Sequence, residues 1–402
     1  MNNFGVLYCY ELKKIWKRKI VYATLAICLI ATAILFIGEF IGSYPIDNEK
    51  SDTKYHMFLT DRNYQKMLNG KELNQSMLEE TIQAYRMIPV TAEKYSSTEE
   101  YQTYARPYSA IFNFVRDTTQ MTFSEIVQWT PRSDDLYARR QSMLENQWIS
   151  ENLSEGEMAF WQQKEADIHT PFVYQITESY YILFRAVTTI GLFVLMAVSI
   201  CLSGLFADEH TRRTDQLILC SKHGKGMAYW AKIFAGISFA IGTSLLLSAF
   251  AAVLSVCIYG TDGFDAMFQL IFAQYSYPLT ACQAVLIVYG CVIVTSVIFS
   301  TVVMLLSEIL HSNIATLAIT FGMLILSMIC SIPSQYRVLA QLWDWLPSAF
   351  LTPWNIFDVR LVSAFGHYLT AWQAVPLIYI FASMIIAVIG KPIYRHFQVS
   401  GR

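Results

Sequence analysis

The sequence has no cysteine in the one long stretch where a disulfide framework would be needed. Its eight cysteines all lie outside residues 44–178, a stretch with the composition of a water-exposed globular region. Exposed domains that rely on disulfide bonds carry their cysteines within the domain itself. We therefore predict that this stretch folds without disulfides. Cys257 and Cys282 lie near the ends of neighbouring apolar segments, so a bridge between them remains an alternative to two small buried thiols.

Motifs for ATP hydrolysis and for intramembrane hydrolysis are also missing. The Gly-Lys pairs at 70–71, 224–225 and 390–391 lack the earlier Gly and the following Ser or Thr that a phosphate-binding loop requires. There is no HExxH, no GxSxG and no pair of intramembrane aspartates, so the parts of the common hydrolases are absent. The apolar segments carry no ionisable residue at their centres, where coupling to an ion gradient would need one. We expect no enzymatic activity and no cofactor in this chain itself.

Long apolar runs make up much of what is present. Hydrophobic residues account for 54% of the chain, and the mean hydropathy is +0.36. A helix needs about 20 mostly apolar residues to cross the hydrocarbon core of a bilayer. The sequence predicts an all-α polytopic membrane protein with six transmembrane helices. The predicted spans are residues 20–43, 180–206, 233–259, 281–310, 314–333 and 373–390.

Basic residues flank the first and the last predicted span. Lys and Arg in short segments beside a span favour the cytosolic side, so both termini are expected in the cytosol, including the tail 391–402. Residues 44–179 would then be extracellular. Their 21 acidic and 13 basic residues over 44–178 do not conflict with this, because long domains translocate largely regardless of charge. The flanking basic residues are Lys13, Lys14, Lys17, Arg18, Lys19, Lys391, Arg395 and Arg402.

The N-terminal residues 1–19 show a helical stripe of apolar side chains with most lysines elsewhere. This pattern is typical of an amphipathic helix lying in the membrane interface. A simple charged anchor before the first span is an equal alternative. The stripe consists of Phe4, Leu7, Tyr8, Leu12 and Ile15.

The predicted extracellular domain, residues 44–179, carries repeated helix-start signals. In a capping box, a Ser hydroxyl and a Glu carboxylate three residues later each satisfy a free backbone N–H. This spacing predicts a mostly helical domain, and about 135 residues can bury a modest core. The candidate boxes are Ser76 with Glu79, Ser97 with Glu100, and Ser154 with Glu157.

Two further features are expected on the extracellular side. Glu39 and Arg185 fall near the outer ends of the first two spans, where they either pair or are hydrated separately. Residues 260–280 form an external loop. Residues 334–372 contain apolar pieces interrupted by Pro347 and Pro353, too short to cross, which indicates re-entrant or interfacial helices before the last span.

The charged segment 207–232 between the second and third spans carries the clearest family signal. It reads Glu209, Arg213-Thr214, Leu217 to Leu219, Ser221 and Lys232. This pattern resembles the loop between the second and third spans of ABC-2-type transporter permeases, which couples them to their ATPase. Arg213 stands where that family often has Gly, and His223 stands near where it often has Pro. The short helices expected at 334–372 are similar to those that join the last two spans of the same permeases.

The resemblance implies the membrane subunit of an ATP-driven exporter in a bacterial cytoplasmic membrane. Such a subunit works as a pair of permease chains, identical or related, with separate ATPase subunits that bind ATP and Mg²⁺. It implies a peptide antibiotic, lipid-like molecule or drug as substrate and no role for nucleic acid. Coupling to the ATPase would fall on Glu209, Thr214, Leu217, Ile218, Ser221 and Lys232. At this spacing Thr214, Leu217, Ile218 and Ser221 fall on one stripe of a short helix, which we call the docking stripe.

Two other hypotheses stay open at this point. The segment 207–232 is also consistent with an ordinary amphipathic connection resting on the lipid surface. The large extracellular region also suits a membrane sensor or receptor component with a ligand-binding ectodomain in a peptide-sensing or resistance complex.

Overall fold

The computed structural model describes residues 3–43, 53–88, 96, 98–132, 135–211, 226–364 and 366–396, and most of them are helical. Within these described residues, five helices are long and apolar enough to cross a membrane. The predicted class of a mostly helical, multi-pass membrane protein is therefore confirmed in outline. These five are α2 (Lys19–Ser43), α9 (Glu178–Leu202) continued by α10 (Gly204–Thr211), α12 (Met227–Tyr259), α13 (Ala281–Leu310) and α18 (Ala371–His396).

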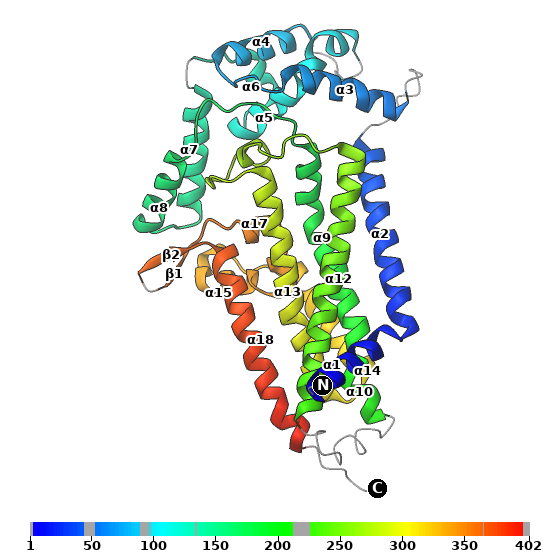
Figure 1. Ribbon diagram of the computed structural model, residues 1–402. Coiled ribbons are helices and arrows are strands. Elements are labelled where there is room, and N and C mark those ends of the chain that lie inside the picture. Colours follow the sequence, from blue (N-terminus) through cyan, green and yellow to red (C-terminus); the bar gives the residue numbers. More distant parts are fainter. Residues whose placement is uncertain are drawn as a thin grey trace.

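The long helices run side by side, with α9 and α13 at the centre of the bundle (Figure 1). α13 packs against α9, α12 and α18, and α2 packs on α9 and α12. The central helices bury most of their apolar surface, whereas the outer helices leave large apolar side chains exposed along one side. A helix in lipid needs no polar outer face, so this exposure fits spans that face the bilayer. Examples are Ile27, Ile30 and Ile34 of α2, and Phe381, Ile385 and Val388 of α18.

The count of six spans is not confirmed, because the fifth predicted span is shorter than expected. Residues 314–333 correspond to α14 (Asn313–Ile329), which has 17 residues and is about 25 Å long. The helix ends where Cys330 takes an extended conformation, three residues before Pro333. Since the hydrocarbon core is roughly 30 Å thick, α14 falls just short of a full crossing.

Two other boundaries also differ from the sequence prediction, and both shorten the expected loop. The second span continues past a turn at Ser203 as α10, which ends at Thr211. The third begins at Met227, six residues before the predicted position 233. Lys232 is therefore part of α12 and not of the loop, because the apolar residues before it already form helical turns.

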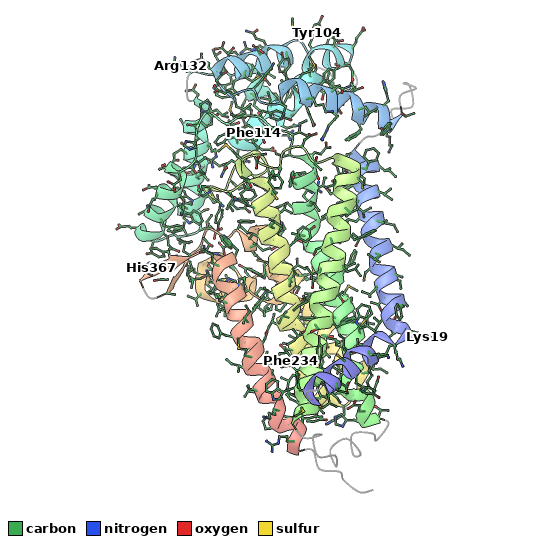
Figure 2. The ribbon with its side chains drawn as sticks, viewed as in Figure 1. Lys19, Tyr104, Phe114, Arg132, Phe234 and His367 are labelled. Carbon is green, nitrogen blue, oxygen red and sulfur yellow. The ribbon has the colours of Figure 1, made fainter. Side chains whose placement is uncertain are left out.

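α1 (Asn3–Trp16) lies across one end of the bundle, where it packs on α12 and the start of α2 (Figure 1). Where α1 crosses α12, the ring centroids of Phe4 and Phe234 are 6.0 Å apart, and Figure 2 labels Phe234. Tyr8 also donates a hydrogen bond of 2.8 Å to the hydroxyl of Ser238. A helix is present here as predicted, and part of its apolar side packs on protein. Its place in the membrane interface stays a prediction. We refer to this end of the bundle as the α1 end.

A set of shorter helices, which we call the cap (residues 53–177), covers the opposite end of the bundle (Figure 1). α3 to α6 lie across the ends of the long helices, and α7 and α8 run along one side. The elements are α3 (Lys54–Leu68), α4 (Gln75–Arg86), the π-helical turn η2 (Tyr101–Ala105), the 3₁₀ turn η3 (Arg106–Tyr108), α5 (Ser109–Thr119), α6 (Phe123–Gln128), α7 (Asp135–Ser150) and α8 (Glu155–Ala166).

The capping boxes proposed from the sequence have mixed outcomes. The box of Ser154 and Glu157 is present at the start of α8. Ser76 was wrong as a cap: it lies within α4, and Asn74 caps that helix because its amide oxygen reaches the N–H of Met77. Ser97 lies outside the described residues. Two boxes that we did not predict are Thr122 with Glu125, and Thr280 with Gln283.

The cap is continuous with the membrane part rather than packed separately. One apolar cluster lies within the cap and takes in Ala273 of the segment 260–280. Other cap residues, including Trp148 and Trp161, belong to the same apolar core as α9, α12 and α13. Buried Arg140 donates to the carbonyl oxygens of Ala273 at 2.9 Å and Tyr275 at 3.1 Å. A fragment cut at either end of the cap would therefore expose large apolar side chains.

The described part of residues 334–370, within the range 334–372 considered above, contains only short elements, as the prolines predicted. Pro347 and Pro353 occupy the first positions of α16 and α17, where a missing N–H costs nothing. The two-stranded antiparallel hairpin of β1 and β2 was not anticipated. The elements are η5 (Ser334–Tyr336), α15 (Arg337–Asp344), α16 (Pro347–Phe350), α17 (Pro353–Ile356), β1 (Val362–Ala364) and β2 (His367–Leu369), and the loop before α13 contains η4 (Phe268–Leu270).

Glu157 joins the cap to these short elements. It is 3% exposed and accepts hydrogen bonds from Ser154, from the guanidinium of Arg337 and from the N–H of Leu361 at 2.9 Å. Burial raises the pKa of Glu157, but these donors outweigh it and hold the pKa below its usual value.

We expect Glu157→Gln to lower the free energy of unfolding by about 1.5–3 kcal/mol at pH 7, because the charge-assisted bond to Arg337 is lost. A lowered folded-state pKa stabilises the protein above the unfolded pKa of about 4.3, and this contribution disappears as the pH falls through the folded value. The difference between wild type and variant should therefore shrink below about pH 4. Unfolding of the purified chain in detergent across this range measures it. Glu155→Gln, an exposed carboxylate on the same helix, is the control.

Candidate functional site at the α1 end

A buried cluster of charges lies at the α1 end of the bundle and centres on Glu209. Glu209, on α10, is 5% exposed, and Lys232, on α12, is fully buried. The carboxylate of Glu209 pairs with Lys232 through one oxygen and with Lys14 of α1 through the other. We call Lys14, Glu209 and Lys232 the triad. It links α10 and α12 to α1, which lies much earlier in the sequence: Lys14 and Glu209 are 195 residues apart.

The triad contains two ammonium groups and one carboxylate, and a second carboxylate beside it balances the remaining positive charge. Glu11, one turn before Lys14 on α1, is 7% exposed and 3.5 Å from the Lys14 ammonium. Burial lowers the pKa of Lys14, but Glu209 and Glu11 more than offset this, so its pKa is raised and it stays charged. Lys232 also lies over the ring of Phe206, 5.0 Å from its centroid, which adds a cation–π contact.

Arg18 reinforces the same junction at the break between α9 and α10. Its guanidinium donates to the carbonyl oxygen of Gly204 at 3.1 Å and pairs with Asp208 at 3.2 Å. On the other side of α10, the hydroxyl of Ser307 accepts from the N–H of Ala207 at 3.1 Å. α10 is thus fixed to the N-terminal segment on one side and to α13 on the other.

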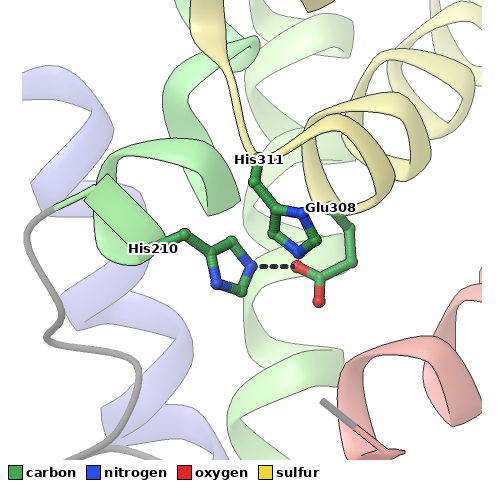
Figure 3. A group of neighbouring side chains, drawn as sticks. All are labelled: His210, Glu308 and His311. Carbon is green, nitrogen blue, oxygen red and sulfur yellow. Dashed lines mark hydrogen bonds and ion pairs between the residues drawn. The ribbon is translucent and has the colours of Figure 1, made fainter. Parts of the chain in front are cut away.

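A second group of polar side chains lies next to the triad and consists of His210, Glu308 and His311 (Figure 3). His210 Nε2 and Glu308 Oε2 are 3.2 Å apart. The ring centroids of His210 and His311 are 4.2 Å apart, and the two rings are nearly perpendicular. One potential ligand atom from each residue lies within 4.8 Å of the others. Among the described residues, these are the ones that could hold a metal ion.

The predicted coupling residues divide into two groups. The structure brings Glu209 and Lys232 together in the triad. Thr214, Leu217, Ile218 and Ser221 lie outside the described residues, so their predicted place on one helical stripe stays a prediction.

At the cap end of the bundle, the predicted outer charges Glu39 and Arg185 form an ion pair of 2.9 Å. This decides between the two alternatives left open by the sequence. Arg185 also lies over the ring of Tyr181, 5.7 Å from its centroid. The Arg185 side chain is 53% exposed and that of Glu39 is 34% exposed, so water weakens the pair and it contributes little to stability.

Sequence reasoning missed the partners that complete both groups. Lys14 was counted only as an orientation signal, and Glu308, near the end of the predicted span 281–310, was given no partner. The available signal was that buried charges in a helix bundle pair with one another. His210 and His311 lie 101 residues apart in the chain, and no spacing pattern joins them.

The comparisons with known proteins leave the family open. No family model matches the chain, and searches of curated proteins and of solved structures gave no match. The case for a function therefore rests on the arrangement of the described residues and on the segment 207–232.

Proposed function

We propose that this chain is the membrane-spanning permease subunit of an ATP-driven ABC exporter. Two such chains, identical or related, would form the translocation path in a bacterial cytoplasmic membrane, and separate ATPase subunits would supply ATP and Mg²⁺ binding. In this proposal α14 is a sixth, short span, the cap is extracellular and the α1 end is cytosolic. The substrate would be a peptide antibiotic, a lipid-like molecule or a drug, moved outward.

The triad is the observation that supports this function best. In the sequence, residues 212–225 connect α10, which ends at Thr211, to α12, which begins at Met227. The pairing of Glu209 with Lys232 fixes these two helices to each other close to where the segment begins and ends. Lys14 fixes α1 to the same point. A push on this segment or on α1 would therefore move α1, α10 and α12 together.

Such a rigid junction suits a mechanism of alternating access. Closure of the ATPase subunits would press on residues 212–225 and on α1, and the triad would pass this movement to α10 and α12. α10 is also bound to α13 through Ser307, so the central helices would follow. Rocking of one group of helices against the other would then open a path toward the cap side.

Purification of the tagged chain from its native membranes tests the proposal. We expect a separate protein with a phosphate-binding loop to co-purify in about equal amount with the permease. Leu217→Asp should reduce its recovery by about tenfold or more, because a charge would lie on the docking stripe. Leu219→Asp is the matched control, because position 219 falls on the opposite side of the same predicted helix. Recovery of no ATPase, or equal recovery with both variants, would contradict the proposal.

One observation favours the second candidate, a membrane sensor. A cavity of about 330 Å³ lies between the cap and the cap end of α9. Its lining combines polar and apolar side chains, including Asn113, Arg116, Tyr174 and Tyr181. A chain that purifies without any ATPase would make this cavity the leading site for a ligand.

A further inference from the structure

The carboxylate of Glu308 is buried without a permanent positive charge beside it among the described residues. Glu308 is 1% exposed, and its Oε1 has no hydrogen-bond partner there. Its one ion pair in the described part of the chain is with His210, which is charged only when protonated. A buried carboxylate is costly unless a cation or several donors compensate for it. A bound cation would therefore compensate the buried charge of Glu308, which the described side chains do not do.

The potential metal ligands of His210 and His311 lie close to this carboxylate. In Figure 3 the rings of His210 and His311 both turn toward Glu308, from α10 and from the turn between α13 and α14. Ligand atoms around a tetrahedral Zn²⁺ ion are roughly 3.4 Å apart, given bonds of about 2.1 Å. The atoms of His210 and Glu308 are 3.2 Å apart, and all three ligand atoms lie within 4.8 Å of one another. Small side-chain rotations are enough to place an ion between them.

We propose that His210, Glu308 and His311 form a binding site for a divalent transition-metal ion of the Zn²⁺ class. Two imidazoles and one carboxylate suit Zn²⁺, whereas Mg²⁺ and Ca²⁺ prefer oxygen ligands. His311 is exposed, so an ion can enter from the surface, while Glu308 anchors it from within. Water would complete the coordination.

Occupation of this site would join α10 to the turn between α13 and α14. His210 lies one residue before the end of α10, and His311 caps the end of α13 with a left-handed backbone, φ +50°. The ion would stiffen the helix that leads into residues 212–225. This inference does not depend on the transport function.

The test uses the full-length chain, purified in detergent with a tag that contains no histidine. Co²⁺ alone is titrated first, because its visible absorption reports nitrogen and oxygen coordination, and Zn²⁺ is then added to displace it. We expect saturation at about one equivalent and a rise in the thermal unfolding midpoint with Zn²⁺. His311→Asn should weaken Zn²⁺ binding by roughly a hundredfold or more and abolish the rise in midpoint. Asn is chosen because it tolerates the left-handed backbone at this position.

His367→Asn is the matched control, because His367 is exposed on β2, far from this site (Figure 2). It should bind Zn²⁺ as the wild type does. X-ray absorption of the wild-type chain with Zn²⁺ gives a readout that needs no variant, and two imidazole ligands are expected. Absence of saturable binding, equal affinity in His311→Asn, or a spectrum dominated by sulfur ligands would overturn the proposal. An ordinary hydrogen-bonded His–Glu pair would then remain.

Discussion

Glu209→Gln is expected to lower the free energy of unfolding of this chain by about 3–5 kcal/mol, because it leaves the buried Lys232 ammonium without its carboxylate. Lys232 is fully buried, so water cannot replace the lost charge. Unfolding of the purified chain in mixed detergent micelles gives the measurement. Asp208→Asn is the matched control: its side chain is 38% exposed and pairs with Arg18, and its loss should cost at most about 1 kcal/mol.

A double variant separates the loss of the pair from the loss of the carboxylate alone. Glu209→Gln with Lys232→Met removes both buried charges of this pair, so it should recover more than half of the stability lost in Glu209→Gln. Equal effects of Glu209→Gln and Asp208→Asn would contradict the interpretation of the triad as a buried charge cluster. Glu209→Lys is less informative, because it would bring three amines together in a buried place.

The same double variant tests coupling apart from stability. If the chain works with an ATPase as proposed, the double variant should fold and assemble in the reconstituted complex but show reduced substrate-stimulated ATP hydrolysis, because α10 and α12 no longer share a charged link. ATP hydrolysis that responds fully to substrate would mean that the triad only stabilises the fold.

Trp161→Ala is the second change with a large expected effect, again about 3–5 kcal/mol of unfolding free energy. The side chain is 1% exposed, and its indole N–H donates to the carbonyl oxygen of Val359 at 2.7 Å. Its ring meets Tyr277 edge to face, with 4.8 Å between centroids. Alanine would leave a large cavity where the cap, the segment 260–280 and the short elements of residues 334–370 meet.

Denaturant unfolding, followed by tryptophan fluorescence and helical circular dichroism, measures the effect of Trp161→Ala. Trp354→Ala is the control, because Trp354 is 65% exposed and its removal opens no cavity. Trp161→Phe keeps most of the volume and loses the hydrogen bond to Val359, so its effect should be intermediate. Similar stability of Trp161→Ala and Trp354→Ala would show that the cap does not depend on this contact.

The sequence by itself determined the class of this protein and the position of its long helices. A run of about 20 apolar residues is long enough to cross a bilayer, and as a helix it pairs its own backbone N–H and C=O groups where no water is present. The sequence alone therefore indicated the helices α2, α9, α12, α13 and α18. The prolines at 347 and 353 likewise excluded a long helix, because each removes a backbone donor. These signals are local, and each is carried by neighbouring residues.

Only the tertiary structure decided which charges meet and where the cap ends. Lys14, Glu209 and Lys232 become neighbours because α1 crosses α12 beside α10, and that crossing depends on packing between segments about 200 residues apart. His210 and Glu308 likewise meet only because α10 packs beside α13, 98 residues later in the chain. The cap has the composition of an independent domain, yet Trp161 is buried against Tyr277 and Val359. Burial and pairing depend on contacts between distant segments, and composition and spacing carry little information about such contacts.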